Sequence, residues 1–244
     1  MKTGIFSDVH GNLEALSAAM AAMAERKVER YWCLGDLVGY CANPNECVAR
    51  VRQTAEAVVR GNHDAACTGG DDIASFNQFA RQAILWTIQH LSDEHKEWIK
   101  NLPLTVTRDD ILLVHASPND PASWHYIHTR MRVGEMVRAF SASPARLIFV
   151  GHSHQPMILV QKGDEYFRFL GDRIKIETDC RYLVNVGSSG QPRDGNPRAA
   201  YVIYDPAEAT VTIERVPYDT ETTKRKIRDA GLPEMLADRL DAGS

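Results

Sequence analysis

Five short apolar segments of this chain each run directly into residues that commonly bind metal ions. In chain order, these residues lie in Asp8-Val9-His10, Gly35-Asp36, Gly61-Asn62-His63-Asp64, His115 and Gly151-His152-Ser153-His154. In open α/β sheets the functional crevice lies beyond the carboxyl ends of the strands. We therefore expect the five junctions to converge on one cleft.

The spacing and the types of these residues suit metal binding. Asp8 with His10, and His152 with His154, are two residues apart, so on extended backbone both members of each pair face one way. Carboxylate, imidazole and amide-oxygen ligands suit manganese, iron, zinc or nickel better than calcium. Any one of these motifs alone is more often an ordinary turn, but their occurrence together, each after a strand, favours a metal site.

Strands and helices must position these residues. They alternate in the first part of the chain, and the later part is mainly β. Apolar runs predict strands at 3–7, 31–34, 57–59, 111–114 and 147–150, with a helix at 13–25, another opening at 43–46 under an Asn43 cap, and two in the middle. Further strands are predicted at 157–160, 166–170, 182–186, 200–204 and 210–216. This order predicts an α/β fold in which the β-rich half packs as a second sheet on the first. We expect a single domain over residues 1–244, with 220–244 as a helical C-terminal tail.

Composition narrows the class of protein. Lys and Arg total 28 against 32 for Asp and Glu, and the one dense basic run, Lys224-Arg225-Lys226, is typical of a solvated helix face. Nucleic acid is therefore not an expected partner. The chain has no apolar run of membrane-spanning length, and its five cysteines form no Cys-x-x-Cys pair, which indicates reduced thiols in a cytoplasmic protein. These features leave the oligomeric state open.

Taken together, the motifs resemble those of the calcineurin-like metallophosphoesterases. The closest likeness is to the YfcE-like bacterial and archaeal phosphodiesterase branch. The likeness is carried by Asp8-Val9-His10-Gly11-Asn12, Gly35-Asp36-Leu37-Val38-Gly39, Gly61-Asn62-His63-Asp64, His115-Ala116-Ser117-Pro118 and Gly151-His152-Ser153-His154. The resemblance implies two stacked mixed β-sheets flanked by helices, with a dinuclear metal site on their shared edge.

The resemblance also implies roles for individual residues. Asp8, His10 and His154 would hold one metal ion, Asn62, His115 and His152 the other, and Asp36 would bridge both. Many relatives carry an Arg where this chain has Asn119, which leaves Arg193 as the candidate phosphate contact. His125, in a loop that follows the His115 junction, is a second candidate for substrate contact.

These residues predict an enzyme that hydrolyses small phosphate esters. Two divalent ions against the charges of Asp8 and Asp36 would leave the pocket near +2, which attracts phosphate oxygens. We expect a phosphodiesterase that uses a metal-bridging hydroxide, with His63 as leaving-group acid and Asp64 orienting the His63 ring.

Other functions of the same fold stay open at this stage. They are a phosphomonoesterase, a dinucleoside-polyphosphate hydrolase and a non-catalytic interaction scaffold. A protein phosphatase is disfavoured, because Val38-Gly39-Tyr40 and Asp64 stand where those enzymes carry Arg-Gly and Glu.

Overall fold

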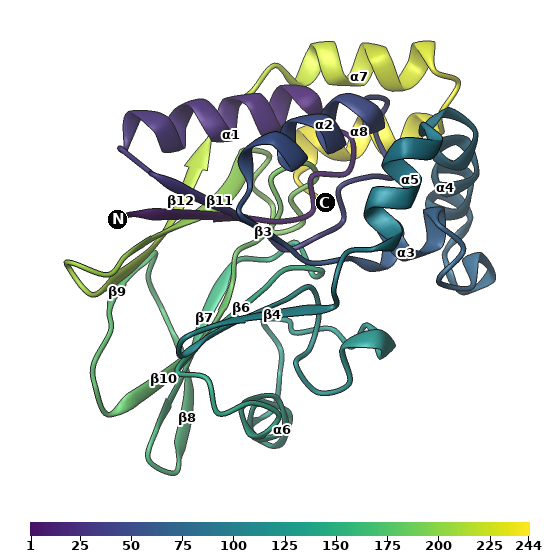
Figure 1. Cartoon of the computed structure of the whole chain (residues 1–244). Helices are drawn as coiled ribbons and strands as arrows, with labels where there is room; N and C mark the ends of the chain where they lie inside the picture. The colour runs from purple at the N-terminus through teal and green to yellow at the C-terminus, as the bar shows by residue number, and fades with distance from the viewer.

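Two six-stranded β-sheets stack face to face, and helices cover their outer surfaces (Figure 1). The computed structural model describes all residues from Met1 to Ser244. The first sheet has the order β3 (Ala57–Val58), β2 (Arg30–Cys33), β1 (Thr3–Phe6), β11 (Ala199–Asp205), β12 (Thr210–Val216) and β9 (Arg173–Lys175). The second has the order β4 (Thr105–Arg108), β5 (Ile111–Val114), β6 (Leu147–Val150), β10 (Cys180–Asn185), β7 (Met157–Lys162) and β8 (Glu165–Phe169).

The strands that precede the ligand-type residues run parallel within each sheet. β1 pairs with β2 and β2 with β3 in parallel, and so do β5 and β6 in the second sheet. Their carboxyl ends therefore lie along one edge of each sheet, and the stacking brings the two edges together. The expectation of two stacked mixed sheets flanked by helices is confirmed.

The expected division of the strands by sequence half was wrong. β11 and β12 return to the first sheet, where Thr3 of β1 lies opposite Tyr204 of β11, while β4, β5 and β6 build the second sheet. All four residues of β1 are buried, so an open edge there would leave backbone groups without partners. Pairing with β11 satisfies them.

The side chains between the two sheets form one shared core. Ile5, Trp32 and Val202 of the first sheet belong to the same cluster as Phe149 and Val184 of the second. Burying a side chain of this kind stabilises a fold by roughly 1.5–3 kcal/mol. Each sheet therefore depends on the other for its apolar face.

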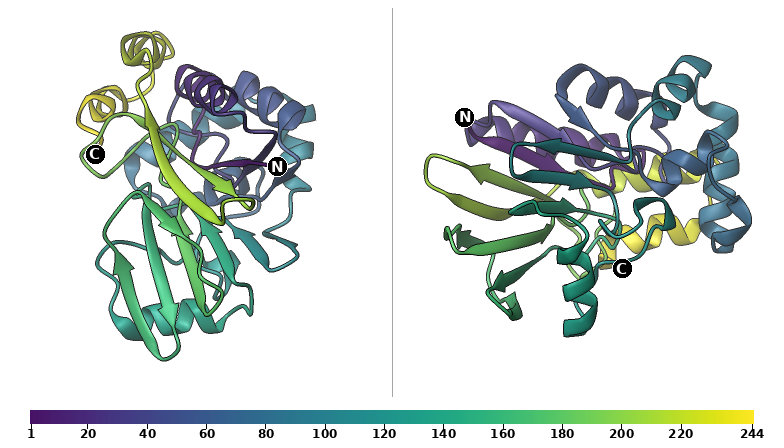
Figure 2. Two further views of the ribbon diagram at one scale, coloured as in Figure 1. Left: turned by 90° about the vertical axis from the view of Figure 1, so that its left-hand side faces the viewer. Right: turned by 60° about the horizontal axis from the view of Figure 1, so that its bottom comes forward.

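Helices flank the sheets on both sides (Figure 2). Their bounds are α1 (Leu13–Glu25), α2 (Pro44–Thr54), α3 (Asn62–Cys67), α4 (Gln78–His90), α5 (Asp93–Lys100), α6 (Val133–Ser141), α7 (Thr220–Asp229) and α8 (Glu234–Ala242). The sequence did not predict α3 or α6, nor the short strands β4 and β9. The helix at 13–25 is confirmed, but Asn43 makes no capping hydrogen bond to α2. Its side-chain oxygen instead accepts from Lys226 Nζ at 2.9 Å.

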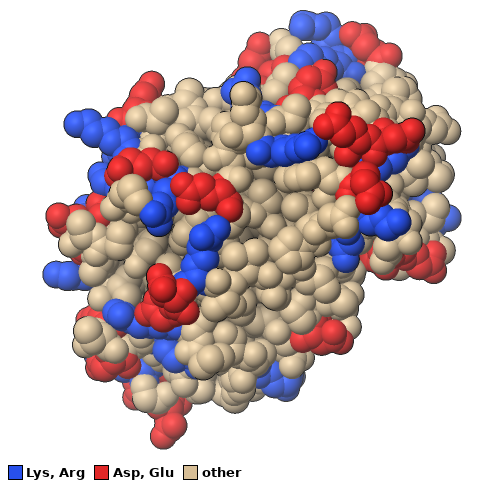
Figure 3. Space-filling view, in the orientation of Figure 1, with Lys and Arg blue, Asp and Glu red and all other residues tan.

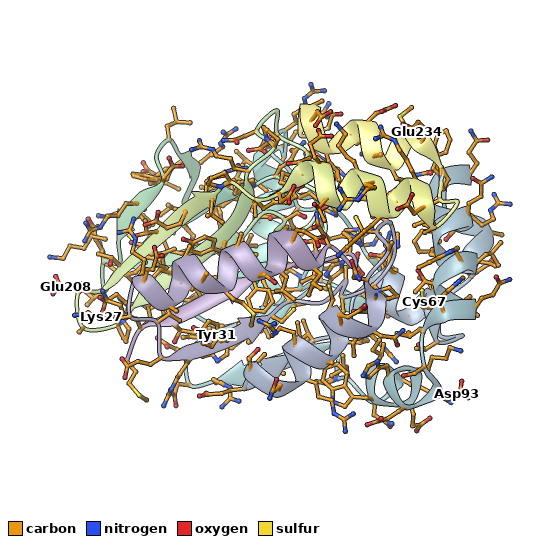
Figure 4. All side chains as sticks on the ribbon, turned by 90° about the horizontal axis from the view of Figure 1, so that it is seen from above. Lys27, Tyr31, Cys67, Asp93, Glu208 and Glu234 are labelled. Carbon is orange, nitrogen blue, oxygen red and sulfur yellow. The ribbon has the colours of Figure 1, made fainter.

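The last two helices pack on the body of the molecule beside α1, as the view onto the helices shows (Figure 4). Ile227 of α7 and Leu236 of α8 share a buried cluster with Tyr40 and Cys41. Thr223 Oγ1 lies 3.1 Å from Asn12 Oδ1. The C-terminal helices therefore contact both the loop that follows β1 and the loop that follows β2.

The surface shown in Figure 3 carries basic and acidic side chains interspersed, with wide uncharged areas between them. None of the helices has both the length and the apolar composition needed to cross a bilayer.

Candidate metal centre

Five strand ends deliver the seven ligand-type residues to one place. Asp8 and His10 follow β1, Asp36 follows β2, and Asn62 begins α3 after β3. His115 follows β5, and His152 and His154 follow β6. Every one of these side chains is buried. The structure brings together the whole set that the sequence singled out.

The distances place Asp36 between two groups of ligands. Asp36 Oδ2 lies 3.6 Å from His10 Nε2 and 3.4 Å from His115 Nε2. On one side, Asp8 Oδ1 is 3.3 Å from His154 Nε2. On the other, Asn62 Oδ1 is 3.2 Å from His115 Nε2. Asp8, His10 and His154 form one compact group, and Asp36, His115 and His152 form another.

The backbone of these loops is strained. Residues with side chains rarely adopt a positive φ, yet five of the ligand-type residues do so. Their φ values are 54° for Asp8, 51° for His10, 51° for Asp36, 64° for His152 and 57° for His154. Such conformations cost on the order of 1–3 kcal/mol each and persist only where the surrounding structure enforces them. A Cβ on Gly61 would lie 2.1 Å from Asp36 Oδ1, so glycine is required at this crossing.

Three of the histidines have a defined tautomer. The Nδ1 atoms of His10, His115 and His154 donate to backbone oxygens of Val38, Leu34 and Gln191 at 3.0, 2.7 and 2.5 Å. Because each Nδ1 carries the proton, each Nε2 presents a lone pair. Those Nε2 atoms all point toward the acidic side chains at the centre.

The nitrogen and oxygen atoms of the candidate ligands crowd together with no positive charge between them. The Nε2 atoms of His10 and His154 are 3.1 Å apart, and the buried atoms Asp8 Oδ1 and His152 Nε2 have no hydrogen-bond partner. Burial alone would lower the pKa of His115, but the Asp36 and Asp8 carboxylates raise it to about 9. A proton is thus favoured where a metal cation would sit. The residues present therefore fit bound metal ions.

A cavity of about 390 Å³ opens onto this centre. His63 lies on its wall, with its ring centroid 4.5 Å from that of Tyr40 and 5.0 Å from that of Phe76, and its Nδ1 has no partner. Burial lowers the pKa of His63 to about 4, although Asp36 opposes the shift. The ring is therefore neutral at pH 7.

Asp64 does not orient His63, contrary to the sequence-based expectation. Its carboxylate accepts from the backbone N–H groups of Leu37 at 2.9 Å and Gly61 at 3.1 Å. Neighbouring residues on α3 project about 100° apart around the helix, so the two side chains diverge. Burial, with Asp36 nearby, raises the pKa of Asp64 to about 7. Asp64 thus holds the Asp36 loop against the start of α3.

The two candidate substrate contacts have different positions. Arg193 lines the metal-centre cavity, donates to Gln191 Oε1 at 2.9 Å and lies 5.4 Å from the ring centroid of Tyr40. His125 lies instead on a second cavity of about 400 Å³. Its neighbours Trp124 and Tyr126 line the metal-centre cavity, and Tyr126 also borders the second cavity.

Sequence reasoning missed several aromatic residues of the site. The tilted ring of Tyr40 packs against both His10 and His63, with centroids 4.5 Å from each, and Phe76 packs edge-on against His63. Phe76 lies just before α4 and lines the cavity. For Tyr40 the available signal was an aromatic residue four positions after Asp36.

Comparisons with known proteins agree with this geometry. The family model described as "Calcineurin-like phosphoesterase superfamily domain" matches residues 1–209. The uncharacterized protein MJ0912 of Methanocaldococcus jannaschii is 37% identical over 243 residues, covering 98% of this chain and 97% of that protein.

Two crystal structures are similar over nearly the whole length. A metallophosphoesterase from Sphaerobacter thermophilus is 39% identical with a TM-score of 0.88, covering 100% of this chain and 99% of the other. The hypothetical protein PH1004 from Pyrococcus horikoshii shares the fold at 21% identity, with a TM-score of 0.82 and coverage of 100% and 98%. This chain belongs to the calcineurin-like phosphoesterase superfamily, whose members depend on two metal ions, and it is a hydrolase of phosphate esters.

Proposed function

We propose that this protein is a phosphodiesterase with two divalent transition-metal ions, manganese, iron, zinc or nickel. Asp8, His10 and His154 would hold one ion, and Asn62, His115 and His152 would hold the other. The observation that carries the proposal is the position of Asp36, whose Oδ2 lies 3.6 Å from His10 Nε2 and 3.4 Å from His115 Nε2. A carboxylate between two ligand groups is suited to bridge two cations.

The chemistry follows from the residues around this centre. When bound, paired divalent ions lower the pKa of water and stabilise the attacking and leaving oxygens of an in-line displacement. Arg193 would bind a non-bridging phosphate oxygen through its guanidinium N–H groups. His63 would donate a proton or a hydrogen bond to the departing oxygen from its place on the cavity wall. An anionic ester beside His63 favours the protonated ring.

The charges of the cavity favour a diester over more highly charged esters. Arg193 is the single Lys or Arg on the cavity wall, and Asp71 lies on the same wall. A phosphodiester carries one negative charge, whereas a monoester carries up to two and a dinucleoside polyphosphate several. Beyond the metal ions, the wall supplies only Arg193 to balance these further charges. A scaffold role is disfavoured because all seven ligand-type side chains are present and buried.

The proposal can be tested with metal analysis and an ester panel. Purified protein would be treated with a chelator, analysed for metal content, and reloaded with manganese, zinc, iron or nickel. We expect activity to disappear with the metals and to return on reloading. The value of kcat/KM should be higher for bis(p-nitrophenyl) phosphate than for p-nitrophenyl phosphate or a dinucleoside polyphosphate. Full activity in metal-free protein, or a clear preference for the monoester, would contradict it.

A further inference from the structure

The ring of Tyr126 has one covered face and one open face. Its centroid lies 4.1 Å from that of His152, with an angle of 21° between the planes, so the two rings are stacked. Tyr126 is nevertheless 56% exposed. The face of the phenol ring that is turned away from His152 is therefore free for contact with another planar group.

Tyr126 also stands between two cavities. It lines the cavity of about 390 Å³ at the metal centre and the neighbouring cavity of about 400 Å³. The second cavity has an apolar part formed by Ile127 and Met131, and polar side chains that include Asn119 and Arg138. Neither Asn119 nor Arg138 has a side-chain hydrogen bond or ion pair within the chain. A substituent attached to a phosphate at the metal centre could pass over Tyr126 and reach these groups.

The neighbouring Trp124 is held in an unfavourable conformation. Its φ of 52° and ψ of 34° are left-handed, and so is the φ of 55° at Asp120 on the other side of the Pro121–Ser123 turn. A bulky residue rarely adopts this region, and such strain is concentrated at binding sites and catalytic sites. This backbone conformation places the Trp124 ring on the wall of the metal-centre cavity, with its centroid 6.0 Å from that of His115.

We propose that Tyr126 and Trp124 form a stacking platform for a planar ring carried by the ester, so that the substrate is a phosphodiester with a nucleoside substituent. The proposal rests on the proposed phosphodiesterase function. Stacking between a base and an aromatic side chain contributes about 1–3 kcal/mol and tolerates different bases, because every base has a π-face. The second cavity, with apolar and unpaired polar side chains, suits the rest of such a substituent.

The test compares two esters that differ only in the group on ribose C1′, which is a base in one and a methoxy group in the other. They are adenosine 5′-(methyl phosphate) and the methyl phosphate of 1-O-methylribose, which have the same leaving group. For the unmodified protein we expect the higher kcat/KM with the adenosine ester. In Tyr126→Leu, which keeps bulk over His152 but removes the ring, the ratio of the two kcat/KM values should fall by about 5- to 150-fold. Tyr126→Phe should keep the ratio.

Binding supplies a readout that is independent of turnover. Isothermal titration with adenosine 5′-monophosphate and with ribose 5-phosphate should show the same loss of preference in Tyr126→Leu. Phe167→Leu is the matched control, since Phe167 is an aromatic residue of β8 that is 43% exposed and lies outside both cavities. This control should leave both ratios unchanged.

Each outcome separates the platform from the phosphodiesterase function. An unchanged ratio in Tyr126→Leu would overturn the platform and leave Tyr126 as a cover for His152. Hydrolysis of bis(p-nitrophenyl) phosphate without any preference for the adenosine ester would also overturn it, while the phosphodiesterase function stood. If no diester were hydrolysed, the phosphodiesterase function would fail. The titrations would then decide the platform alone.

Discussion

The Nε2 atoms of His10 and His154 face each other at 3.1 Å, although the Nδ1 atom of each ring already donates to a backbone oxygen. Neither ring has a second proton to place between them in its neutral form. Two lone pairs at this separation repel, and only a cation removes the repulsion. The folded chain thus holds the two rings in a geometry that a bound cation would relieve.

Removing the charge of Asp36 should weaken both groups of ligands. Asp36→Asn keeps a side-chain oxygen that can accept from the backbone N–H of His63, which donates to Asp36 Oδ1 at 2.8 Å in the unmodified protein, but it removes the negative charge. We expect metal affinity to fall by at least about tenfold, with less metal bound per chain in a titration followed by metal analysis. Asp164→Asn, in the turn between β7 and β8, serves as the control. Full activity of Asp36→Asn at low metal concentration would rule out a shared bridging ligand.

His63 and a metal ligand should fail in different ways. His63→Ala should keep its metals, because the proposed ligand set does not include His63. An alkyl leaving group departs poorly without a proton, so we expect a loss on the order of 10²–10⁴-fold in kcat for an alkyl ester. A nitrophenyl ester should lose much less. Equal losses for both esters, with metal retained, would show that His63 binds a phosphate oxygen instead of protonating the leaving group.

Arg193 should contribute mainly to substrate binding. It has no carboxylate partner and interacts within the chain with Gln191 and Tyr40, so an ion pair does not account for its position. A hydrogen bond to a charged group contributes about 1.5–3 kcal/mol, so Arg193→Ala should raise KM by roughly 10- to 150-fold with little change in kcat. Arg198→Ala, an exposed residue outside the cavity, is the comparison. Unchanged steady-state kinetics for Arg193→Ala would exclude the phosphate contact.

The C-terminal helices should affect catalysis through Tyr40. Leu236 and Leu183 are both fully buried, but only Leu236 shares a cluster with Tyr40, whose ring contacts His10 and His63. Leu236→Ala and Leu183→Ala should each lower the free energy of unfolding by about 2–5 kcal/mol. At a temperature where both variants are folded, only Leu236→Ala should lower kcat. The same kcat for both would limit α7 and α8 to a stabilising role.

The cysteines should react slowly in the folded protein. All five are free and buried, and burial raises the pKa of Cys33, Cys41, Cys47 and Cys67 above the ordinary range. The reactive thiolate is therefore scarce at pH 8, and it should stay scarce as the pH rises to 9. Mass spectrometry after iodoacetamide treatment should find these four thiols unmodified in folded protein and modified in denaturant. Rapid alkylation of any of the four at pH 8 would contradict the burial.

The candidate metal-binding residues could be found in the sequence because they lie at or shortly after the ends of apolar strands, and their assignment to two ions came from the family resemblance. The end of a parallel strand fixes where Asp8, Asp36 and His115 lie, whatever the rest of the chain does. The residues that line the cavity could not be predicted in this way. Tyr126 lines the metal-centre cavity and His125 does not, and this difference depends on loop conformation. The prediction that Asp64 orients the His63 ring failed for a similar reason, because a short helix that was not predicted turns the two side chains apart.

The pairing of β1 with β11 limits how early the first sheet can fold during synthesis of the chain. Thr3 and Tyr204 are on the order of 200 residues apart along the chain, and the backbone oxygens of Ser7 and Asp8 are bonded by the N–H groups of Ser189 and Gly190. Such long-range contacts form late and slow the folding of a chain. On the ribosome, the loop that carries Asp8 and His10 can bond to the loop after β2 early, but it lacks the bonds from Ser189 and Gly190 until those residues have been released. A nascent chain that ends before β10 should therefore bind metal weakly, and loading with metal should follow synthesis.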